Sequence, residues 1–140
     1  MSTATDLLTA DDLDFLGRPL HGFLTVPGGE PPSQPRPVWF EATAEGTIQF
    51  FTEADSLKVR RLHRDPRASI VVAAPVGERE RWVSVVGRAT VEADGARELC
   101  TRLAARYWDL DDRAADLDAM LAADQLRVVL HPETVRRFAY

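Results

Sequence analysis

Short apolar segments separated by turn-forming residues recur through most of this 140-residue chain, and they restrict it to a fold rich in β-strands. Segments 20–26, 47–52, 67–74 and 81–92 have the length of strands, and 67–74 is so continuously apolar that neither of its faces is expected to meet solvent. The Pro- and Gly-rich stretch 27–35 between them cannot join a central sheet. No apolar segment is long enough to span a membrane as a helix.

Strands and helices are expected in a mixed order along the rest of the chain. Further strands are expected at 36–43, which forms a hairpin with 47–52, and at 125–132 and 134–139. Helical spacing and capping residues predict helices at 9–17, 56–65, 93–107 and 112–123. Together these elements predict a single α+β domain over residues 1–140, built on an antiparallel barrel. Because several strands are apolar on both faces, we also expect a homodimer.

The charge distribution is uneven, and it favours a local anion site. The net charge is −5, yet residues 58–67 carry +4, which leaves −9 on the remainder. A protein that binds nucleic acid would usually need a broad basic face, so no nucleic-acid partner is expected. The acidic N-terminus has no signal-peptide pattern, and a cytoplasmic location is expected.

Residues that carry metal or nucleophilic chemistry are sparse. Cys100 is the one cysteine, and His21, His63 and His131 are scattered without metal-ligand spacing. The sequence has no catalytic triad, no convincing pair of carboxylates and no Gly-rich nucleotide loop. No catalytic residue and no metal ligand is therefore assigned.

Lys58 is the only lysine, and it falls in the first turn of the helix that Ser56 is expected to cap. A lysine there opposes the helix dipole by roughly 0.3–1 kcal/mol, unless an anion binds at the same helix end. A helical wheel places Lys58 at the border of the core with Arg61 within reach of the same ligand, whereas Arg60 and Arg64 point to solvent. The alternative is an Arg-rich, solvated helix with no ligand.

Three stretches carry a resemblance to a known family. They are FFTEADSLKVRRLHRDPRASIVV (50–72), PRPVWF (35–40) and RWVSVVGRATV (81–91). Together they resemble the split-barrel flavin-binding family, which includes pyridoxamine 5'-phosphate oxidase and the deazaflavin (coenzyme F-420)-dependent reductases. The resemblance covers roughly residues 10 to 92, and the expected strands near 125–138 agree with it.

The resemblance implies a homodimer with the cofactor at the subunit interface. The cofactor phosphate is expected on Thr52, Ser56 and Lys58, and the ring system against the strand 36–40. The residues that it assigns to cofactor binding are Arg36, Pro37, Val38, Trp39, Phe40, Phe51, Thr52, Ser56, Lys58, Arg61 and Trp82.

The chain also departs from the oxidase pattern. Oxidase relatives have Arg where Leu57 stands and Gln where Trp82 stands, and they continue beyond the position of Tyr140 into a segment for pyridoxal phosphate. The stretch around Lys58 is most similar to the deazaflavin branch, so we expect coenzyme F-420, with FMN as the alternative. In that branch the cofactor carries a hydride to a small organic acceptor, and the protein supplies position and electrostatics.

Other functions remain open at this point. One is an FMN-dependent oxidoreductase, and another is a non-enzymatic protein that only binds flavin or haem, with His21 and His63 as candidate haem ligands. A nucleic-acid-binding regulator would have to use the basic helix. The sequence assigns no ligand to the acidic helices within 93–123.

Overall fold

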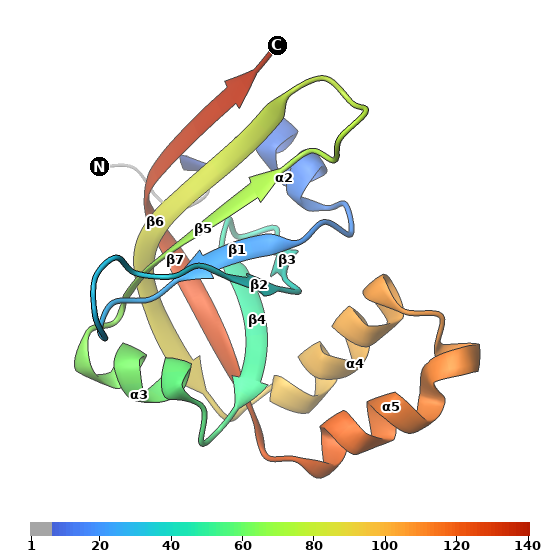
Figure 1. The fold of residues 1–140 in the computed structure, drawn as a ribbon. Coiled ribbons are helices and arrows are strands. Elements are labelled where there is room, and N and C mark those ends of the chain that lie inside the picture. Colours follow the sequence, from blue (N-terminus) through green and yellow to red (C-terminus); the bar gives the residue numbers. More distant parts are fainter. Residues whose placement is uncertain (1–6) are drawn as a thin grey trace.

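The computed structural model describes residues 7–140, and its strands form one antiparallel sheet that curls around the core (Figure 1). The strand order is β2-β1-β5-β6-β7-β4-β3. The bounds are β1 Gly22–Thr25, β2 Arg36–Val38, β3 Glu41–Ala42, β4 Ile48–Glu53, β5 Arg67–Ala73, β6 Arg81–Glu92 and β7 Gln125–Ala139. The expected antiparallel α+β fold is confirmed.

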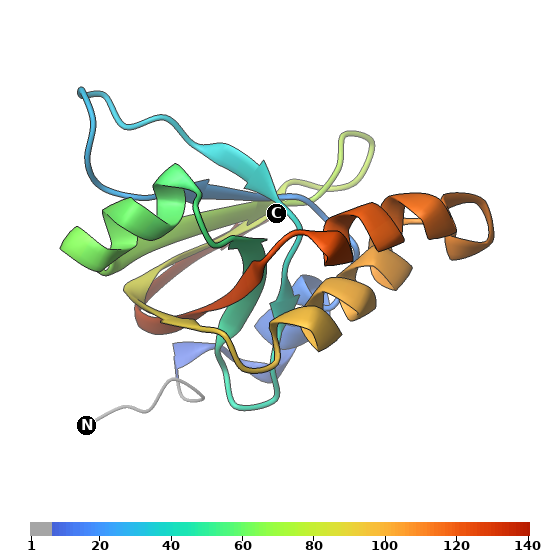
Figure 2. The same cartoon turned by 90° about the horizontal axis from the view of Figure 1, so that it is seen from below.

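One helix precedes β1, one joins β4 to β5, and two lie in the connection from β6 to β7. They are α2 Ala10–Leu16, α3 Leu57–Arg64, α4 Ala96–Tyr107 and α5 Leu110–Ala122. Seen from below, α3 lies on one side of the sheet together with the loop that joins β1 to β2, and α4 and α5 lie on the other (Figure 2). Each predicted helix is present, with ends that differ from the expectation by no more than a few residues.

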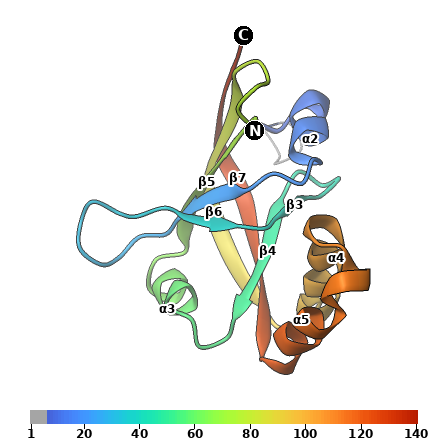
Figure 3. The ribbon, with the colours of Figure 1, turned by 45° about the vertical axis from the view of Figure 1, so that its right-hand side comes forward.

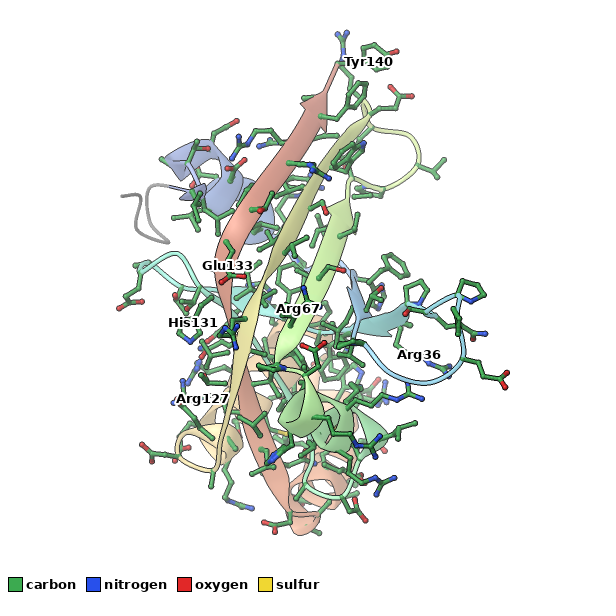
Figure 4. The ribbon with its side chains drawn as sticks, turned by 90° about the vertical axis from the view of Figure 1, so that its left-hand side faces the viewer. Arg36, Arg67, Arg127, His131, Glu133 and Tyr140 are labelled. Carbon is green, nitrogen blue, oxygen red and sulfur yellow. The ribbon has the colours of Figure 1, made fainter. Side chains whose placement is uncertain are left out.

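The two longest strands, β6 and β7, are bent at a β-bulge. Their register shifts at Val86/Gly87, where Gly87 pairs with Pro132 and Glu133 is the extra residue. A Cβ at Gly87 would lie 2.0 Å from the carbonyl oxygen of His131, so only glycine fits. Figure 4 shows His131 and Glu133 at this midpoint of β7. The bulge was expected at Gly87, but the two strands expected at 125–132 and 134–139 are one strand, because Pro132 falls where the ladder is already interrupted.

The strand expected at 36–43 is divided between two neighbours. β2 pairs with β1, whereas only β3 forms the hairpin with β4. Phe40 lies at the division: its side chain is fully buried, and its backbone N–H donates to the hydroxyl of Tyr107 instead of to a strand. The expected single strand was therefore wrong, since the Tyr107 hydroxyl on α4 accepts the hydrogen bond that a neighbouring strand would otherwise accept.

The core fills the inside of the curled sheet with residues such as Phe50, Ile70 and Val85. The opposite face of the same strands is also partly apolar. It leaves five large side chains exposed in the single chain, which we call the outer apolar face: Phe23, Val71, Trp82, Val86 and Phe138. The expectation that neither face of β5 meets solvent is thus not met within one chain, where Val71 is 37% exposed.

Within residues 7–140, no helix combines the length and apolar character needed to cross a bilayer.

An ion pair between the buried Asp12 and the half-exposed Arg137 joins α2 to the far end of β7. Asp12 is 2% exposed, completes a capping box with Thr9, and accepts hydrogen bonds from Nε and Nη2 of Arg137 at 2.8–3.2 Å. Burial alone would raise the pKa of Asp12, but the hydrogen bonds from Arg137 and Thr9 outweigh it and hold the pKa below its usual value. The ionised form therefore stabilises the fold.

We predict that Asp12→Asn lowers the free energy of unfolding by roughly 1–2 kcal/mol at pH 7, since solvent screens the half-exposed Arg137. Because the folded-state pKa is depressed, this stabilisation is fully present above the unfolded-state value near 3.8 and is lost as the pH falls from there through the lower folded-state pKa. Urea unfolding at pH 7 and pH 3 measures the difference, with Asp11→Asn as the control, since Asp11 is exposed. An equal loss at both pH values would assign the effect to shape instead of charge.

Candidate functional site

The start of α3 is built around the hydroxyl of Ser56. Thr52, buried at the end of β4, donates to Ser56 Oγ at 3.0 Å, and the backbone N–H of Val59 donates to the same atom at 3.4 Å. Both contacts use Ser56 as an acceptor, so its own hydroxyl hydrogen remains for a third group. The expected cap is confirmed, and it leaves the Ser56 hydroxyl able to donate to a further group.

Lys58 lies half-buried in the first turn of the same helix. Burial, and then the positive charge of Arg36 nearby, lower the pKa of Lys58 below its usual value. Within residues 7–140, the side chains of Lys58, Arg36 and Arg61 form no ion pair. Two cations near a helix N-terminus repel each other, and an anion bound between them would offset this repulsion.

These cations line a cavity of ≈ 580 Å³ that the β1–β2 loop covers. The loop contributes residues from 28 to 34, and α3 contributes Ser56, Lys58 and Arg61. Arg61 packs against two glycines with positive φ, and a Cβ at Gly29 would lie 2.6 Å from its Nη2 atom. Glu30 is the one carboxylate in the lining, so the cavity walls remain net positive.

A second cavity of ≈ 370 Å³ lies next to the first. Both are lined by Pro37 and Lys58. The rest of its lining is His21 and a set of apolar or aromatic side chains: Val38, Trp39, Phe51, Trp108 and Met120. In Figure 3, α3 lies on one side of β4 and α4 and α5 lie on the other, so the second cavity runs from the cationic end of α3 toward α4 and α5.

An aromatic cluster fixes the wall of this second cavity. Trp39 stacks on Tyr107, with ring centroids 5.1 Å apart and planes 4° apart, and makes edge contacts with Phe51 and Trp108. The Tyr107 hydroxyl donates to the carbonyl of Leu20 at 2.6 Å, which positions the ring. Burial raises the pKa of Tyr107, so the phenol stays protonated.

The structure brings most of the predicted site residues together. Arg36, Pro37, Ser56, Lys58 and Arg61 line the first cavity. Val38, Trp39 and Phe51 line the second, and Thr52 supports Ser56 from behind. Two predicted residues lie elsewhere.

Phe40 is fully buried in the barrel core, because its side chain points to the opposite side from Trp39. Trp82 stacks against Phe138 on the outer apolar face, with ring centroids 6.1 Å apart. That end of β7 carries Tyr140 and is distant from Arg36 (Figure 4). Within one chain, Trp82 therefore lines neither cavity.

Sequence reasoning missed the contribution of α4 and α5 to the cavity wall. Neither Trp108 nor the distant Met120 was expected to join Trp39. The one local signal is a pair of aromatic residues at the end of a helix, immediately before an acidic segment. The residues of the loop 28–34 carried no signal beyond their turn-forming composition.

The two histidines considered as haem ligands lie apart. His21 lines the second cavity, whereas His63 lies on the exposed side of α3 beside Arg60 and Arg64. Residues 7–140 contain no group of three His, Cys, Asp or Glu side chains that could hold a metal ion.

Residues 14–138 match the family described as pyridoxamine 5'-phosphate oxidase. The chain belongs to this family. No curated protein matches it. The family includes oxidoreductases and proteins that bind flavin-type cofactors.

Solved structures share the fold at low sequence identity. A conserved hypothetical protein from Mycobacterium tuberculosis is 21% identical with a TM-score of 0.76, over 99% of this chain and 90% of that chain. An F-420 reductase is 23% identical with a TM-score of 0.71, over 88% of this chain and 94% of the other. An FAD-binding protein from Mesorhizobium loti is 17% identical with a TM-score of 0.63, over 95% and 96%. These similarities show a common fold.

We predict that Lys58→Met raises the free energy of unfolding of the ligand-free protein by roughly 0.5 kcal/mol. The change removes a half-buried charge that opposes both the helix dipole and Arg36. The control is Arg64→Met in the last turn of the same helix, where a cation is favourable and its loss is expected to destabilise slightly. Urea unfolding measures both, and marked destabilisation by Lys58→Met would identify a structural role for the lysine.

Proposed function

We propose that this protein is an oxidoreductase that binds the deazaflavin coenzyme F-420 and passes a hydride to a small organic acceptor. The observation that carries the proposal is the first cavity, where Arg36, Lys58 and Arg61 line one space and form no ion pair within residues 7–140. Family membership supports a flavin-type cofactor. The cavity chemistry supports an anionic group on that cofactor.

The two adjacent cavities fit the two chemical parts of such a cofactor. The phosphate-bearing tail is assigned to the first cavity, within reach of the Ser56 hydroxyl and Lys58. The ring system is assigned to the second, along Pro37, Val38 and Trp39. When bound, the deazaflavin supplies the hydride chemistry, and the chain's residues hold the tail, orient the ring and exclude water from it.

Coenzyme F-420 is favoured over FMN by the number of cations in the first cavity. Its tail carries more negative charge than the single phosphate of FMN, and Arg61 adds a further positive group beside the glycine-lined loop. Leu57 stands where oxidase relatives have Arg, and its side chain is 48% exposed. The fold similarity to an F-420 reductase agrees with this choice.

We further propose that two copies pair through the outer apolar face. Phe23 and Val71 are register partners on adjacent strands, and Val86 and Phe138 continue the patch across β6 and β7. A homodimer formed there would cover side chains that one chain leaves exposed. It would also give Trp82, which is remote from its own chain's cavities, a position from which to approach the partner's cofactor.

We predict that Val71→Glu shifts the protein from dimer to monomer, because it places a charge at the centre of the outer apolar face without entering the core. Sedimentation at several concentrations measures the mass. Ala119→Glu, on the exposed side of α5, is the matched control and should leave the dimer intact. A wild-type monomer at micromolar concentration would refute the pairing.

Separate titrations with F-420 and FMN test the cofactor assignment. We expect tight binding of F-420, with Lys58→Ala weakening it by about 10- to 100-fold through the loss of a charge-assisted contact. Arg64→Ala is the control, since it removes a cation from the same helix outside the cavity.

The cofactor assignment fails if FMN alone binds, although the oxidoreductase class then stands. Binding of neither cofactor would refute the proposed function. Binding of F-420 that is indifferent to Lys58 would refute the site.

A further inference from the structure

The second cavity has an end that the cofactor tail cannot explain. Lys58 and Pro37 mark the end that it shares with the first cavity, whereas Trp108 and Met120 come from α4 and α5 on the other side of β4 (Figure 3). Trp108 is the residue that ends α4, and Met120 lies in the last turn of α5. These two side chains form a wall that the barrel itself does not provide.

Helix α5 contributes little else to the structure. None of its residues is buried; Met120 lines the second cavity, and Leu121 borders α4. Most of its surface is therefore solvated, so the apolar wall is the part of α5 with a specific structural consequence. A helix retained for a core contact would bury apolar side chains more completely.

Trp108 is held in a defined orientation at this wall. Its ring meets Trp39 edge-on, with centroids 4.8 Å apart and planes at 90°. The guanidinium of Arg113 lies 4.0 Å from the Trp108 ring centroid, at the residue where α5 departs from helical geometry. Trp39 is itself stacked on Tyr107, so the wall is rigid before any ligand arrives.

The charges near Trp108 disfavour an anion. Asp109, Asp111 and Asp112 follow it in the chain. Arg113 contacts the Trp108 ring but is ion-paired with Asp116, and no cation from α4 or α5 lines the cavity. Lys58 belongs to the opposite end, which leaves His21 as the one other titratable side chain in the lining. A carboxylate ligand would lose its hydration here without gaining a cationic partner.

We propose that the end of the second cavity between Trp39, Trp108 and Met120 binds the hydride acceptor, and that the acceptor is a flat, conjugated and uncharged molecule. Its role as acceptor rests on the proposed function, whereas its binding does not. Trp108 is a specificity-determining residue: its ring bounds the space in which a planar molecule packs. The acidic turn after it selects against anionic analogues.

Two probes of the same shape test the charge preference. Cinnamamide is a neutral conjugated amide, and cinnamate is its anionic counterpart. Ligand-observed NMR measures their dissociation constants in phosphate buffer, which supplies an anion for the first cavity. Tighter binding of cinnamamide than of cinnamate is expected, and equal binding or a preference for cinnamate would overturn the proposal.

Variants test the position. Trp108→Ala is expected to weaken cinnamamide binding by about 3- to 10-fold, the contribution of one aromatic contact. Met120→Trp, which fills the cavity without removing its support, should also weaken it. Ala119→Trp places the same indole on the exposed side of α5, outside the cavity, and should leave binding unchanged. Affinity unchanged in both Trp108→Ala and Met120→Trp would overturn the proposal.

The outcome separates this proposal from the cofactor assignment. Lys58→Ala should weaken F-420 binding and leave cinnamamide binding in place, because its charge lies at the other end of the cavity. Cinnamamide binding that depends on Trp108 supports the pocket even if F-420 does not bind. F-420 binding with no cinnamamide binding refutes the pocket and leaves the cofactor assignment intact.

Discussion

Uncompensated positive charge at the start of α3 is the constraint on which the arrangement of the site depends. Lys58 is half-buried beside Arg36 and near free helical N–H groups, and neither cation has an ion-pair partner among residues 7–140. The surroundings hold this unfavourable combination in place: Thr52 fixes Ser56, and the Gly28–Gly29 turn leaves room for Arg61. Local rules broken in a well-supported setting are typical of a binding site.

The barrel makes that setting rigid by joining distant segments through a few side chains. Tyr107 connects α4 to the backbone at Leu20 and Phe40, and so fixes the segment between β2 and β3 that carries Trp39. Arg127 reaches Gln49 on β4, and Arg102 on α4 reaches Glu41 on β3. Cationic and aromatic walls therefore sit on one framework, although they come from helices on opposite sides of β4.

The sequence predicted the parts of the structure that depend on local chemistry. The cap at Ser56, the buried face of α3 and the glycine at the bulge follow from spacing and backbone geometry, and all three are present. The strand at 36–43 was misjudged because its division depends on Tyr107, a residue 67 positions from Phe40. The wall formed by Trp108 and Met120 was missed for the same reason, since only the fold brings α5 to β2.

The position of Trp82 shows how a family pattern and a single chain can disagree without contradiction. Its indole lies on the outer apolar face with Phe138, where one chain offers it no role in the cavities. The side chains around it are apolar and exposed, which costs solubility unless another surface covers them. If a second copy does so, the same contact that buries this face brings Trp82 toward the partner. Assembly and site formation would then be one event, and a change that separates the subunits would weaken cofactor binding without touching Lys58.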